Sequence, residues 1–196
     1  MTTHDKVAGL LLAAGAGRRM GMPKALVTYR GRLFVESAAD VLADGGCRPV
    51  LVVLGAEADR VRTSARLDGV QIVDNPEWNE GMGASVRVGL STVGGLPDVM
   101  AAVVLPVDVP GVTAAAVARL VAVAGPDVLA RASFDGVPGH PVVIGRDHWA
   151  GVISSAVGDV GARDYLRARN VLDVPCGDVA VGTDVDRPAD LERLGP

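Results

Sequence analysis

The sequence contains few aromatic residues and few cysteines. Aromatic side chains make up 3% of the 196 residues, whereas hydrophobic residues of all kinds make up 49%. The core must therefore be aliphatic, which suits parallel strands covered by helices on both faces. Cys47 and Cys176 are far apart in the sequence and form no Cys-x-x-Cys pattern. We therefore expect two buried thiols rather than a disulfide or a metal site.

Long apolar runs and an excess of positive charge are also missing. Neither apolar run, 7–16 nor 99–107, approaches the roughly 20 residues that cross a bilayer, so no membrane partner is expected. The residues before the first run lack the apolar region and cleavage site of a secretory signal, which favours a cytoplasmic location. The formal net charge of -4 argues against a nucleic-acid partner, because binding a phosphate backbone requires a basic surface.

No internal repeat, linker or low-complexity segment divides the chain. A length of 196 residues suits one domain, so we predict a single domain over 1–196. Apolar runs alternate with helical periods, which predicts an α/β fold with a doubly wound, mostly parallel sheet and helices on both faces. Strands are predicted over 7–14, 49–55, 70–74, 99–105, 127–132 and 171–174, and helices over 33–44, 56–67, 85–93 and 113–124, with one ending at 169 and a short one in the tail.

The first apolar strand runs into a glycine-rich, basic loop that predicts a phosphate cradle. Glycines let backbone N–H groups turn toward an anion, and arginine and lysine side chains supply charge where a triphosphate would lie. The alternative is a strand-to-helix turn whose basic residues face water. The residues assigned to nucleotide binding here are Leu12, Ala13, Ala14, Gly15, Gly17, Arg18, Arg19 and Lys24.

Two well-known glycine motifs do not fit this loop. A dinucleotide fingerprint requires a third glycine three positions after the second, and Met20 stands there. A P-loop requires Gly-Lys-Ser/Thr, whereas Lys24 follows Pro23 and precedes Ala25. The loop is therefore a third kind of phosphate loop.

A second candidate binding loop covers 75–85. Gly81 and Gly83 permit close backbone approach, and Ser85 is predicted to open a helix. The amides of a helix N-terminus and a serine hydroxyl could recognise polar edges of a base or ribose. The alternative makes Ser85 a simple N-cap and Trp78 a core anchor.

Two aspartates are candidate metal ligands. Asp108 follows the most hydrophobic strand, and a carboxylate at the end of a buried strand is costly unless something pairs with it. Mg²⁺ would do so beside a triphosphate, because it prefers one or two carboxylates plus phosphate oxygens. Capping of the next helix is the alternative, although Thr113 is better placed for it. Asp186, near the start of the tail helix, is either an N-cap or a second ligand of that metal.

A hairpin-like segment over 133–141 is a third candidate binding region, on which a second substrate could lie. His140, between Gly139 and Pro141, could contact an anionic acceptor, with a structural role as the alternative. Arg163, at the start of a predicted helix, is a candidate phosphate ligand.

Together these residues resemble the nucleotidyltransferases of the molybdenum-cofactor type. The stretch from Leu12 to Lys24 is similar to the first motif of that family, Leu-Ala-Ala-Gly-x-Gly-x-Arg-Met-Gly-x-x-Lys. Further segments look like its later motifs and occur in the same order, across nearly the full chain. They are Asn75-Pro76-x-Trp78-x-x-Gly81-Met82-x-x-Ser85, Leu105-x-x-Asp108-x-Pro110, Gly139-His140-Pro141, Gly158-Asp159-x-Gly161-Ala162-Arg163 and Asp184-Val185-Asp186 with Pro188.

The resemblance implies a Rossmann-like nucleotidyltransferase fold and an enzyme that transfers a nucleotidyl group from a nucleoside triphosphate to a phosphorylated acceptor, with Mg²⁺ as cofactor and pyrophosphate as leaving group. In the most similar subgroup the acceptor is molybdopterin and the nucleotide is CTP. Ala14 favours CTP, since cytidylyl enzymes typically have Leu-Ala-Ala-Gly and guanylyl enzymes Leu-Ala-Gly-Gly. Relatives often carry glycine where this chain has Val107, and Gln or Met where it has Val109, which bears on the acceptor.

In this interpretation Lys24, Arg19 and Asp108 are the catalytic residues, and Asp108 with Asp186 holds the metal. Two other functions stay open. The chain could be a non-catalytic nucleotide-binding accessory protein that partners a molybdenum hydroxylase, or it could transfer the nucleotide to a sugar or alditol phosphate. Acceptor pockets depend on loop shape, so the sequence does not separate these functions.

Overall fold

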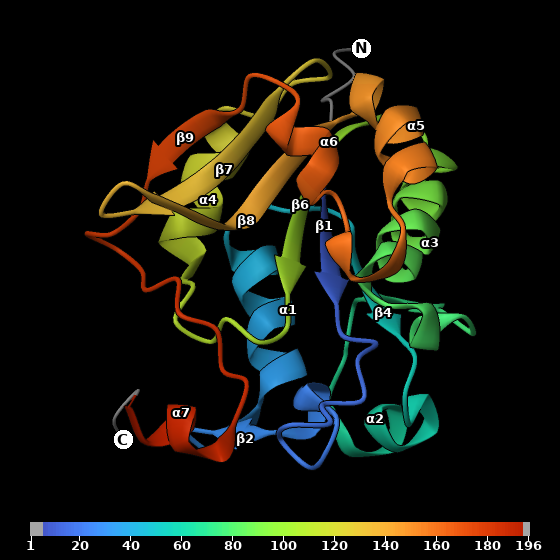
Figure 1. Ribbon diagram of the computed structural model, residues 1–196, viewed down its shortest axis with the longest axis vertical. Coiled ribbons are helices and arrows are strands. Elements are labelled where there is room, and N and C mark those ends of the chain that lie inside the picture. Colours follow the sequence, from blue (N-terminus) through green and yellow to red (C-terminus); the bar gives the residue numbers. More distant parts are fainter. Residues whose placement is uncertain (1–5, 194–196) are drawn as a thin grey trace.

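The protein is a single α/β domain built on one seven-stranded sheet (Figure 1). The computed structural model describes residues 6–193. The strand order is β5-β4-β1-β6-β8-β7-β9, and only β8 runs antiparallel to its neighbours. The strands are β1 (Lys6–Leu12), β4 (Val50–Leu54), β5 (Gln71–Asp74), β6 (Val99–Pro106), β7 (Leu129–Phe134), β8 (Val137–Gly145) and β9 (Leu172–Pro175), and a separate small hairpin joins β2 (Thr28–Tyr29) to β3 (Arg32–Leu33).

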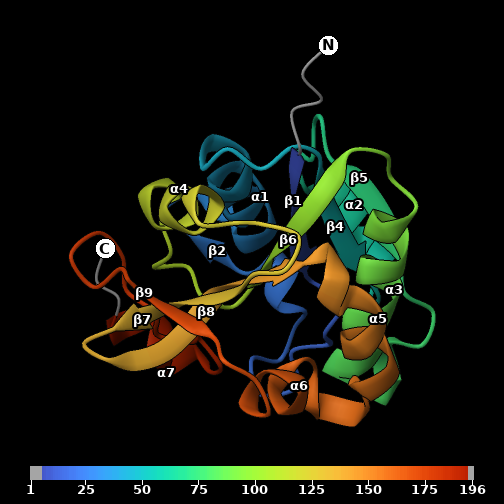
Figure 2. The same cartoon turned by 90° about the horizontal axis from the view of Figure 1, so that it is seen from above.

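Helices cover both faces of the sheet, as the sequence predicted. Figure 2 shows α1 and α4 on one side of the strands and α3, α5 and α6 on the other. The helices are α1 (Phe34–Asp44), α2 (Ala58–Ser64), α3 (Met82–Gly94), α4 (Ala114–Ala122), α5 (Arg146–Ser155), α6 (Arg163–Arg167) and α7 (Pro188–Arg193), with 3-10 turns η1 (Lys24–Leu26), η2 (Trp78–Glu80) and η3 (Gly158–Val160).

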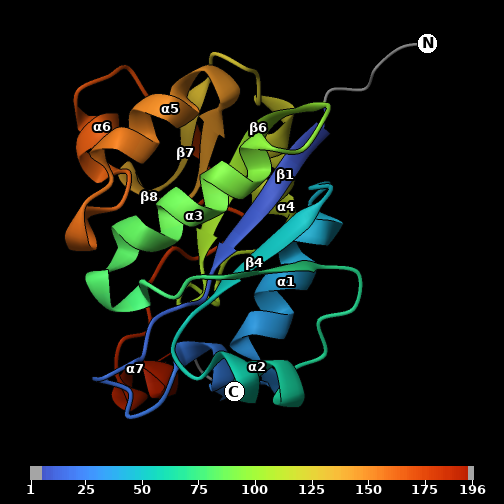
Figure 3. The same ribbon diagram turned by 90° about the vertical axis from the view of Figure 1, so that its right-hand side faces the viewer.

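Residues of β1 alternate between two aliphatic cores. Leu11 belongs to the core under α1 and α4, whereas Leu10 and Leu12 belong to the core under α3 and α5. Successive side chains of a strand point to opposite faces, so a strand that is apolar throughout contributes to both cores. Figure 3 shows α3 lying along one face of the sheet. Gly89 of α3 lies over Leu10, and a Cβ there would be 2.7 Å from a Leu10 methyl, so the missing side chain lets the helix approach β1.

The chain path creates a crevice at the carboxyl ends of β1 and β6. From β1 the chain moves outward through β4 to β5, and α3 then brings it back to β6 on the opposite side of β1. Ligands of open α/β sheets bind where the strand order reverses in this way. The fold therefore places the binding crevice between the segments that follow β1 and β6.

Most predicted elements are present, with differences at α3 and β8. The helix predicted from Ser85 begins three residues earlier, at Met82, because Gly81 adopts φ +110° and turns the chain into the helix. The segment after β7 was expected to be hairpin-like, and it does form an antiparallel hairpin with β7, but its second arm is a nine-residue strand, β8, that had not been predicted. The prediction of Thr113 as a cap is confirmed, since its Oγ1 accepts a hydrogen bond of 3.3 Å from the Ala116 N–H.

Both cysteines are buried free thiols, as predicted. Across residues 6–193, no helix has the length and apolar character that a membrane crossing requires. The segment considered for a secretory signal lies largely outside the described residues, and the cytoplasmic location stays a prediction.

Candidate functional site

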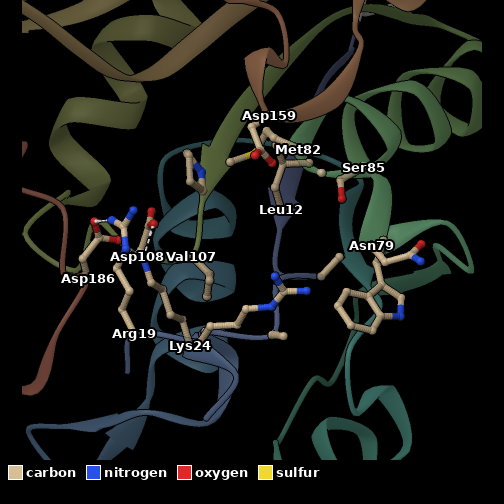
Figure 4. Close-up of a pocket in the computed structure, with 18 residues that line it drawn as sticks. Leu12, Arg19, Lys24, Asn79, Met82, Ser85, Val107, Asp108, Asp159 and Asp186 are labelled. Atoms are coloured by element: carbon tan, nitrogen blue, oxygen red, sulfur yellow. Dashed lines mark hydrogen bonds and ion pairs between the residues drawn. The ribbon is translucent and has the colours of Figure 1, made fainter. Parts of the chain in front are cut away.

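A cavity of about 420 Å³ opens at the carboxyl ends of β1 and β6, where the strand order reverses. One wall comes from the glycine-rich loop after β1, and another from the segment between β5 and α3. The floor is the end of β6, and the tail of the chain closes one side (Figure 4). The lining residues are Leu12, Ala14, Gly15, Ala16, Gly17, Arg18, Arg19, Lys24, Trp78, Asn79, Gly81, Met82, Ser85, Pro106, Val107, Asp108, Asp159 and Asp186.

The glycine-rich loop is held at both of its ends. Ala13 N–H donates to the carbonyl of Val53, and the carbonyl of Ala14 accepts from Ala56 N–H, each at 2.9 Å, so the loop leaves the sheet beside β4. At its other end Lys24 opens the turn η1, whose Ala25 and Leu26 are buried. The Lys24 backbone is therefore anchored in the core while its side chain extends toward the cavity.

Lys24 bridges the two aspartates that the sequence predicted as metal ligands. Its Nζ lies 2.8 Å from Asp108 Oδ2 and 2.5 Å from Asp186 Oδ1. Arg19 adds a second contact to Asp186, at 3.1 Å from Oδ2. Figure 4 shows these four side chains together at one side of the cavity, and Asn79 and Ser85 at the other.

The contacts between Lys24 and the two aspartates shift the pKa values of the groups in this part of the cavity. Burial alone would lower the pKa of Lys24, but hydrogen bonds and charges from Asp108 and Asp186 offset it and raise the pKa above its usual value. The hydrogen bond from Lys24 lowers the pKa of Asp186. Neighbouring Asp184 has a raised pKa because it is partly buried and repelled by Asp108 and Asp186. Three carboxylates therefore share this corner with a charged lysine.

The tail reaches Asp108 because Val185 is part of the core. Its side chain is completely buried, and its N–H donates to the carbonyl of Asp108 at 2.8 Å. In an extended segment, residues on either side of a buried one face away from the core. Asp184 and Asp186 thereby face away from that core, and Asp186 lines the cavity.

The alternative in which Asp186 caps the tail helix is wrong. The helix α7 begins at Pro188, two residues after Asp186, and the Asp186 oxygens contact Lys24 and Arg19. From inside the helix, Asp190 Oδ2 reaches back and accepts hydrogen bonds from the N–H groups of Asp186 and Arg187 at 3.0 and 2.9 Å. These bonds lower the pKa of Asp190. The carboxylate of Asp186 is left to Lys24 and Arg19.

The protein offers a cation few ligands of its own. Among the described residues, no group of three or more His, Cys, Asp or Glu side chains is placed to hold a metal ion. Asp108 and Asp186 nevertheless approach closely enough for one ammonium group to contact both. Two carboxylates beside an open cavity fit Mg²⁺, which is bound in phosphate-transfer sites by one or two carboxylates, substrate phosphates and waters.

The segment 75–85 forms a rigid wall around Ser85. Ser85 is buried in the first turns of α3, and its Oγ accepts a 3.0 Å hydrogen bond from Asn75 Nδ2. Asn75 Oδ1 in turn accepts from the Glu77 N–H at 3.1 Å. The Ser85 hydroxyl hydrogen is not used in this bond, so it is available to a ligand in the cavity.

Two residues assigned to nucleotide binding lie outside the cavity lining. Ala13 points into the core under α1 and α4. Gly83 faces the backbone of Ala156, and a Cβ on Gly83 would lie 2.8 Å from it. Its small size is therefore explained by the packing of α3 against the end of α5.

The two predicted acceptor residues lie beyond the lining. His140 is on β8, and its pKa is lowered by burial and by the charge of Arg163, while Asp108 acts in the opposite direction. His140 therefore lies within electrostatic reach of both residues. Arg163 is exposed at the start of α6.

Sequence reasoning did not assign several lining residues to the site. Asn79 and Met82 lie within the 75–85 loop that it had singled out. Asp159 had been named only within the motif Gly158-Asp159-x-Gly161-Ala162-Arg163, yet it lines the cavity, and a Cβ on Gly81 would lie 2.4 Å from its Oδ1. Its position beside Gly158 in a glycine-flanked motif was the available signal.

The chain is similar to known proteins over most of its length. The model of the MobA-like NTP transferase domain matches residues 9–174. The nicotine blue oxidoreductase of Paenarthrobacter nicotinovorans is 39% identical over 198 residues, which cover 96% of each chain. The molybdenum cofactor guanylyltransferase of Rhodobacter capsulatus is 29% identical over 206 residues, covering 96% of this chain and 94% of that protein.

Solved structures with a similar fold cover nearly the whole chain. Rv0371c from Mycobacterium tuberculosis H37Rv superposes with a TM-score of 0.84 at 28% identity, covering 97% of this chain and 98% of that one. The complex of that protein with manganese gives a TM-score of 0.80 at 26% identity, covering 96% and 97% of the two chains.

Proposed function

The chain belongs to the MobA-like NTP transferase family, and we propose that it transfers a nucleotidyl group from a nucleoside triphosphate to a phosphorylated small-molecule acceptor. One observation carries the proposal: the loop lysine Lys24 meets Asp108 and Asp186 in the cavity at the switch point of the sheet. A phosphate-binding cation and two carboxylates in one corner are the groups that this chemistry requires.

The nucleotide is proposed to span the cavity. Its phosphates would lie against the loop amides, Arg18, Arg19 and Lys24. Its base and ribose would lie toward Asn79 and Ser85 on the opposite wall. Arg18 supports this orientation, because it lines the cavity and makes no ion pair within the described part of the chain. Ser85 supports it through its unused hydroxyl hydrogen.

The reaction then requires positioning rather than covalent help from the protein. An oxygen of the acceptor phosphate attacks the α-phosphorus in line with pyrophosphate, the new P–O bond forms, and pyrophosphate leaves with its bonding electrons. No general base is needed, because a phosphate acceptor is already ionised. Lys24 and Arg19 would hold the triphosphate while charge moves to the leaving group.

Mg²⁺ is the proposed cofactor, with Asp108 and Asp186 as its protein ligands. The fit rests on the two carboxylates that a single ammonium group, that of Lys24, contacts, and a bound divalent cation would neutralise the charge that develops on the phosphates. Manganese bound to the structurally similar M. tuberculosis protein supports a divalent cation in this fold.

The nucleotide is proposed to be CTP and the acceptor molybdopterin. Ala14, which lines the cavity, supports CTP through the Leu-Ala-Ala-Gly pattern. The similarity to the R. capsulatus guanylyltransferase supports a molybdenum cofactor as acceptor. His140 and Arg163 would contact the anionic acceptor, because both Arg163 and Asp108 lie close enough to His140 to affect its pKa.

Pyrophosphate release with CTP, GTP, ATP or UTP, Mg²⁺ and molybdopterin tests the proposal. We expect release with CTP, loss of release in Asp108→Asn, and wild-type rates in Asp44→Asn, which changes an exposed aspartate at the end of α1. Near-wild-type turnover of Asp108→Asn would overturn the assignment. Nucleotide binding without release for any nucleotide, with molybdopterin or a sugar phosphate, would favour the accessory role with a molybdenum hydroxylase.

A second candidate is an oxidoreductase, favoured by 39% identity to the nicotine blue oxidoreductase over nearly the full chain. The cavity loop lacks the dinucleotide fingerprint, which weighs against it. Incubation with nicotine blue and NADH or NADPH separates the two functions, because a reductase would change the absorbance of the dye without releasing pyrophosphate.

A further inference from the structure

Lys24 occupies the position that a cation shared by Asp108 and Asp186 would take. Its ammonium group contacts one oxygen of each carboxylate, at 2.8 and 2.5 Å. The Lys24 side chain is 16% exposed and that of Asp108 is 22% exposed, so the contact is partly shielded from water. The two carboxylates therefore already have a cationic partner supplied by the chain.

A divalent cation cannot join this arrangement without disturbing it. A cation bound to both carboxylates would lie within a few ångströms of the ammonium group, and like charges at that distance repel strongly in a partly shielded site. Asp186 also carries Arg19 at 3.1 Å. Two positive side chains thus oppose the entry of a further positive charge.

We propose that Lys24 alternates between two sets of partners, an inference that rests on the proposed function. Without nucleotide, Lys24 bridges Asp108 and Asp186 and weakens the binding of a divalent cation. When a triphosphate enters, the ammonium group moves to phosphate oxygens and releases both carboxylates to the cation. Nucleotide and cation therefore bind cooperatively, and each raises the affinity for the other by the same factor.

The local structure suits such an exchange. The Lys24 backbone is fixed, because Ala25 and Leu26 of the same turn are buried, whereas its side chain has four rotatable carbon–carbon bonds. An ammonium group is a compact charge with three donors and needs no fixed plane, unlike a guanidinium. The chain contains only two lysines, Lys6 and Lys24, among its 19 basic residues. One of these two lysines, Lys24, therefore lies at the position where the proposed exchange requires a movable point charge.

Manganese binding in the absence and presence of nucleotide tests the exchange. Free Mn²⁺ is measured by electron paramagnetic resonance during titration of wild type, Lys24→Met, Asp108→Asn and Lys6→Met. Lys6→Met makes the same chemical change at an exposed position on β1. Thermal unfolding of each variant establishes that it is folded.

Without nucleotide, we expect Lys24→Met to bind Mn²⁺ at least about tenfold more tightly than wild type, because one competing charge is removed. Lys6→Met should match wild type, and Asp108→Asn should bind most weakly. A non-reactive CTP analogue should tighten Mn²⁺ binding to wild type by a much larger factor than to Lys24→Met. Equal or weaker Mn²⁺ binding by Lys24→Met without nucleotide would overturn the exchange.

Wild type alone provides a second measurement if Lys24→Met does not fold. Nucleotide must then raise the affinity of wild type for Mn²⁺ by about tenfold or more, and an unchanged affinity overturns the exchange. The proposed function is tested separately by pyrophosphate release. Suppose that Lys24→Met binds Mn²⁺ more tightly than wild type but wild type releases pyrophosphate from no nucleotide. The exchange would then stand, and the transferase function would be rejected.

Discussion

Gly17 lies directly against the carbonyl oxygen of Met22. A Cβ built on Gly17 would be 1.9 Å from that oxygen, and Gly17 has a φ of +59°. The Gly17 carbonyl also accepts hydrogen bonds from the N–H groups of Met20 and Gly21, each at 2.9 Å. The loop is therefore closed upon itself between Gly17 and Met22, which fixes the stretch that carries Arg18 and Arg19.

Replacing Gly17 by alanine should open this loop. The methyl group cannot be placed without moving Met22, and the left-handed conformation costs a non-glycine residue about 1 kcal/mol more. We expect nucleotide affinity to fall by about tenfold or more in isothermal titration. Gly69→Ala is the control, because Gly69 has φ +73° with nothing within 4 Å of a new Cβ and does not line the cavity. A matching loss of affinity in the control would contradict the role of the loop.

Substitutions at the adjacent residues Ala13 and Ala14 distinguish recognition of the base from a general loss of core packing. Ala14 lines the cavity near Trp78, whereas Ala13 packs in the opposite core. We expect Ala14→Gly to shift the preference from CTP toward GTP, because removing the methyl group makes room for a larger base. Thermal shifts with the four nucleoside triphosphates measure the preference. Ala13→Gly should lower stability without changing the order of nucleotides, and a changed order there would refute the interpretation.

The sequence predicted the sheet, the helical layers and the segments that form the cavity. These follow from local patterns: buried strands are apolar throughout, and glycines and helix caps mark where they end. The meeting of Lys24 with the aspartates did not follow, because 84 and 162 residues separate the partners. Lys24 had been assigned to phosphate alone.

Gly83 shows why spacing does not reveal what a glycine accommodates. The sequence predicted close approach of a ligand, and the structure shows close approach of the backbone at Ala156. Close approach of a ligand and close approach of a backbone segment both require a residue without a side chain, so both place a glycine at this position in the sequence. Asp186 shows the same limit for a carboxylate. The sequence left it as either a helix cap or a metal ligand, and only the structure shows that its oxygens contact Lys24 and Arg19.

Arg87 ties the wall of the cavity to α5. Its guanidinium donates to the carbonyl of Ala156 at 2.8 Å and to Glu80 at 2.7 Å. Arg87→Met should release both segments, lower stability by about 1–2 kcal/mol, and raise the nucleotide Kd several-fold because Asn79 and Met82 lose their support. Arg60→Met is the control, since Arg60 forms an exposed pair with Glu57 away from the cavity. Nucleotide titration and urea unfolding measure both effects, and unchanged affinity in Arg87→Met would exclude a positioning role.

Glu36 should make the free energy of unfolding depend on pH. Burial would raise the pKa of this carboxyl, but hydrogen bonds from the N–H groups of Arg66 and Leu33 and the nearby arginine charges offset it and lower the pKa. A carboxyl with a lowered folded pKa stabilises the fold above its unfolded pKa, about 4.3, and that contribution is lost as the pH falls through the folded value.

Glu36→Gln should therefore cost about 1–3 kcal/mol near pH 7, and the difference from wild type should shrink near pH 3.5, about one unit below the unfolded pKa. Urea unfolding at the two pH values measures this, with exposed Glu192→Gln as the control. A difference between wild type and Glu36→Gln that stays constant over this range would rule out the ionised carboxylate as the cause.

Arg163 should act on the acceptor and not on the nucleotide. It is exposed at the start of α6 beyond the cavity lining, and it lies close enough to His140 to lower the pKa of that histidine. Arg163→Ala should lower kcat/KM for the acceptor by about tenfold, the usual effect of losing a charged hydrogen bond, while the Kd for CTP stays unchanged. Arg167→Ala, on the same helix, where Arg167 forms an exposed pair with Asp164 at 3.6 Å, is the matched control. If Arg163→Ala instead weakened CTP binding and left the acceptor KM unchanged, Arg163 would belong to the nucleotide subsite and the acceptor would have to bind elsewhere.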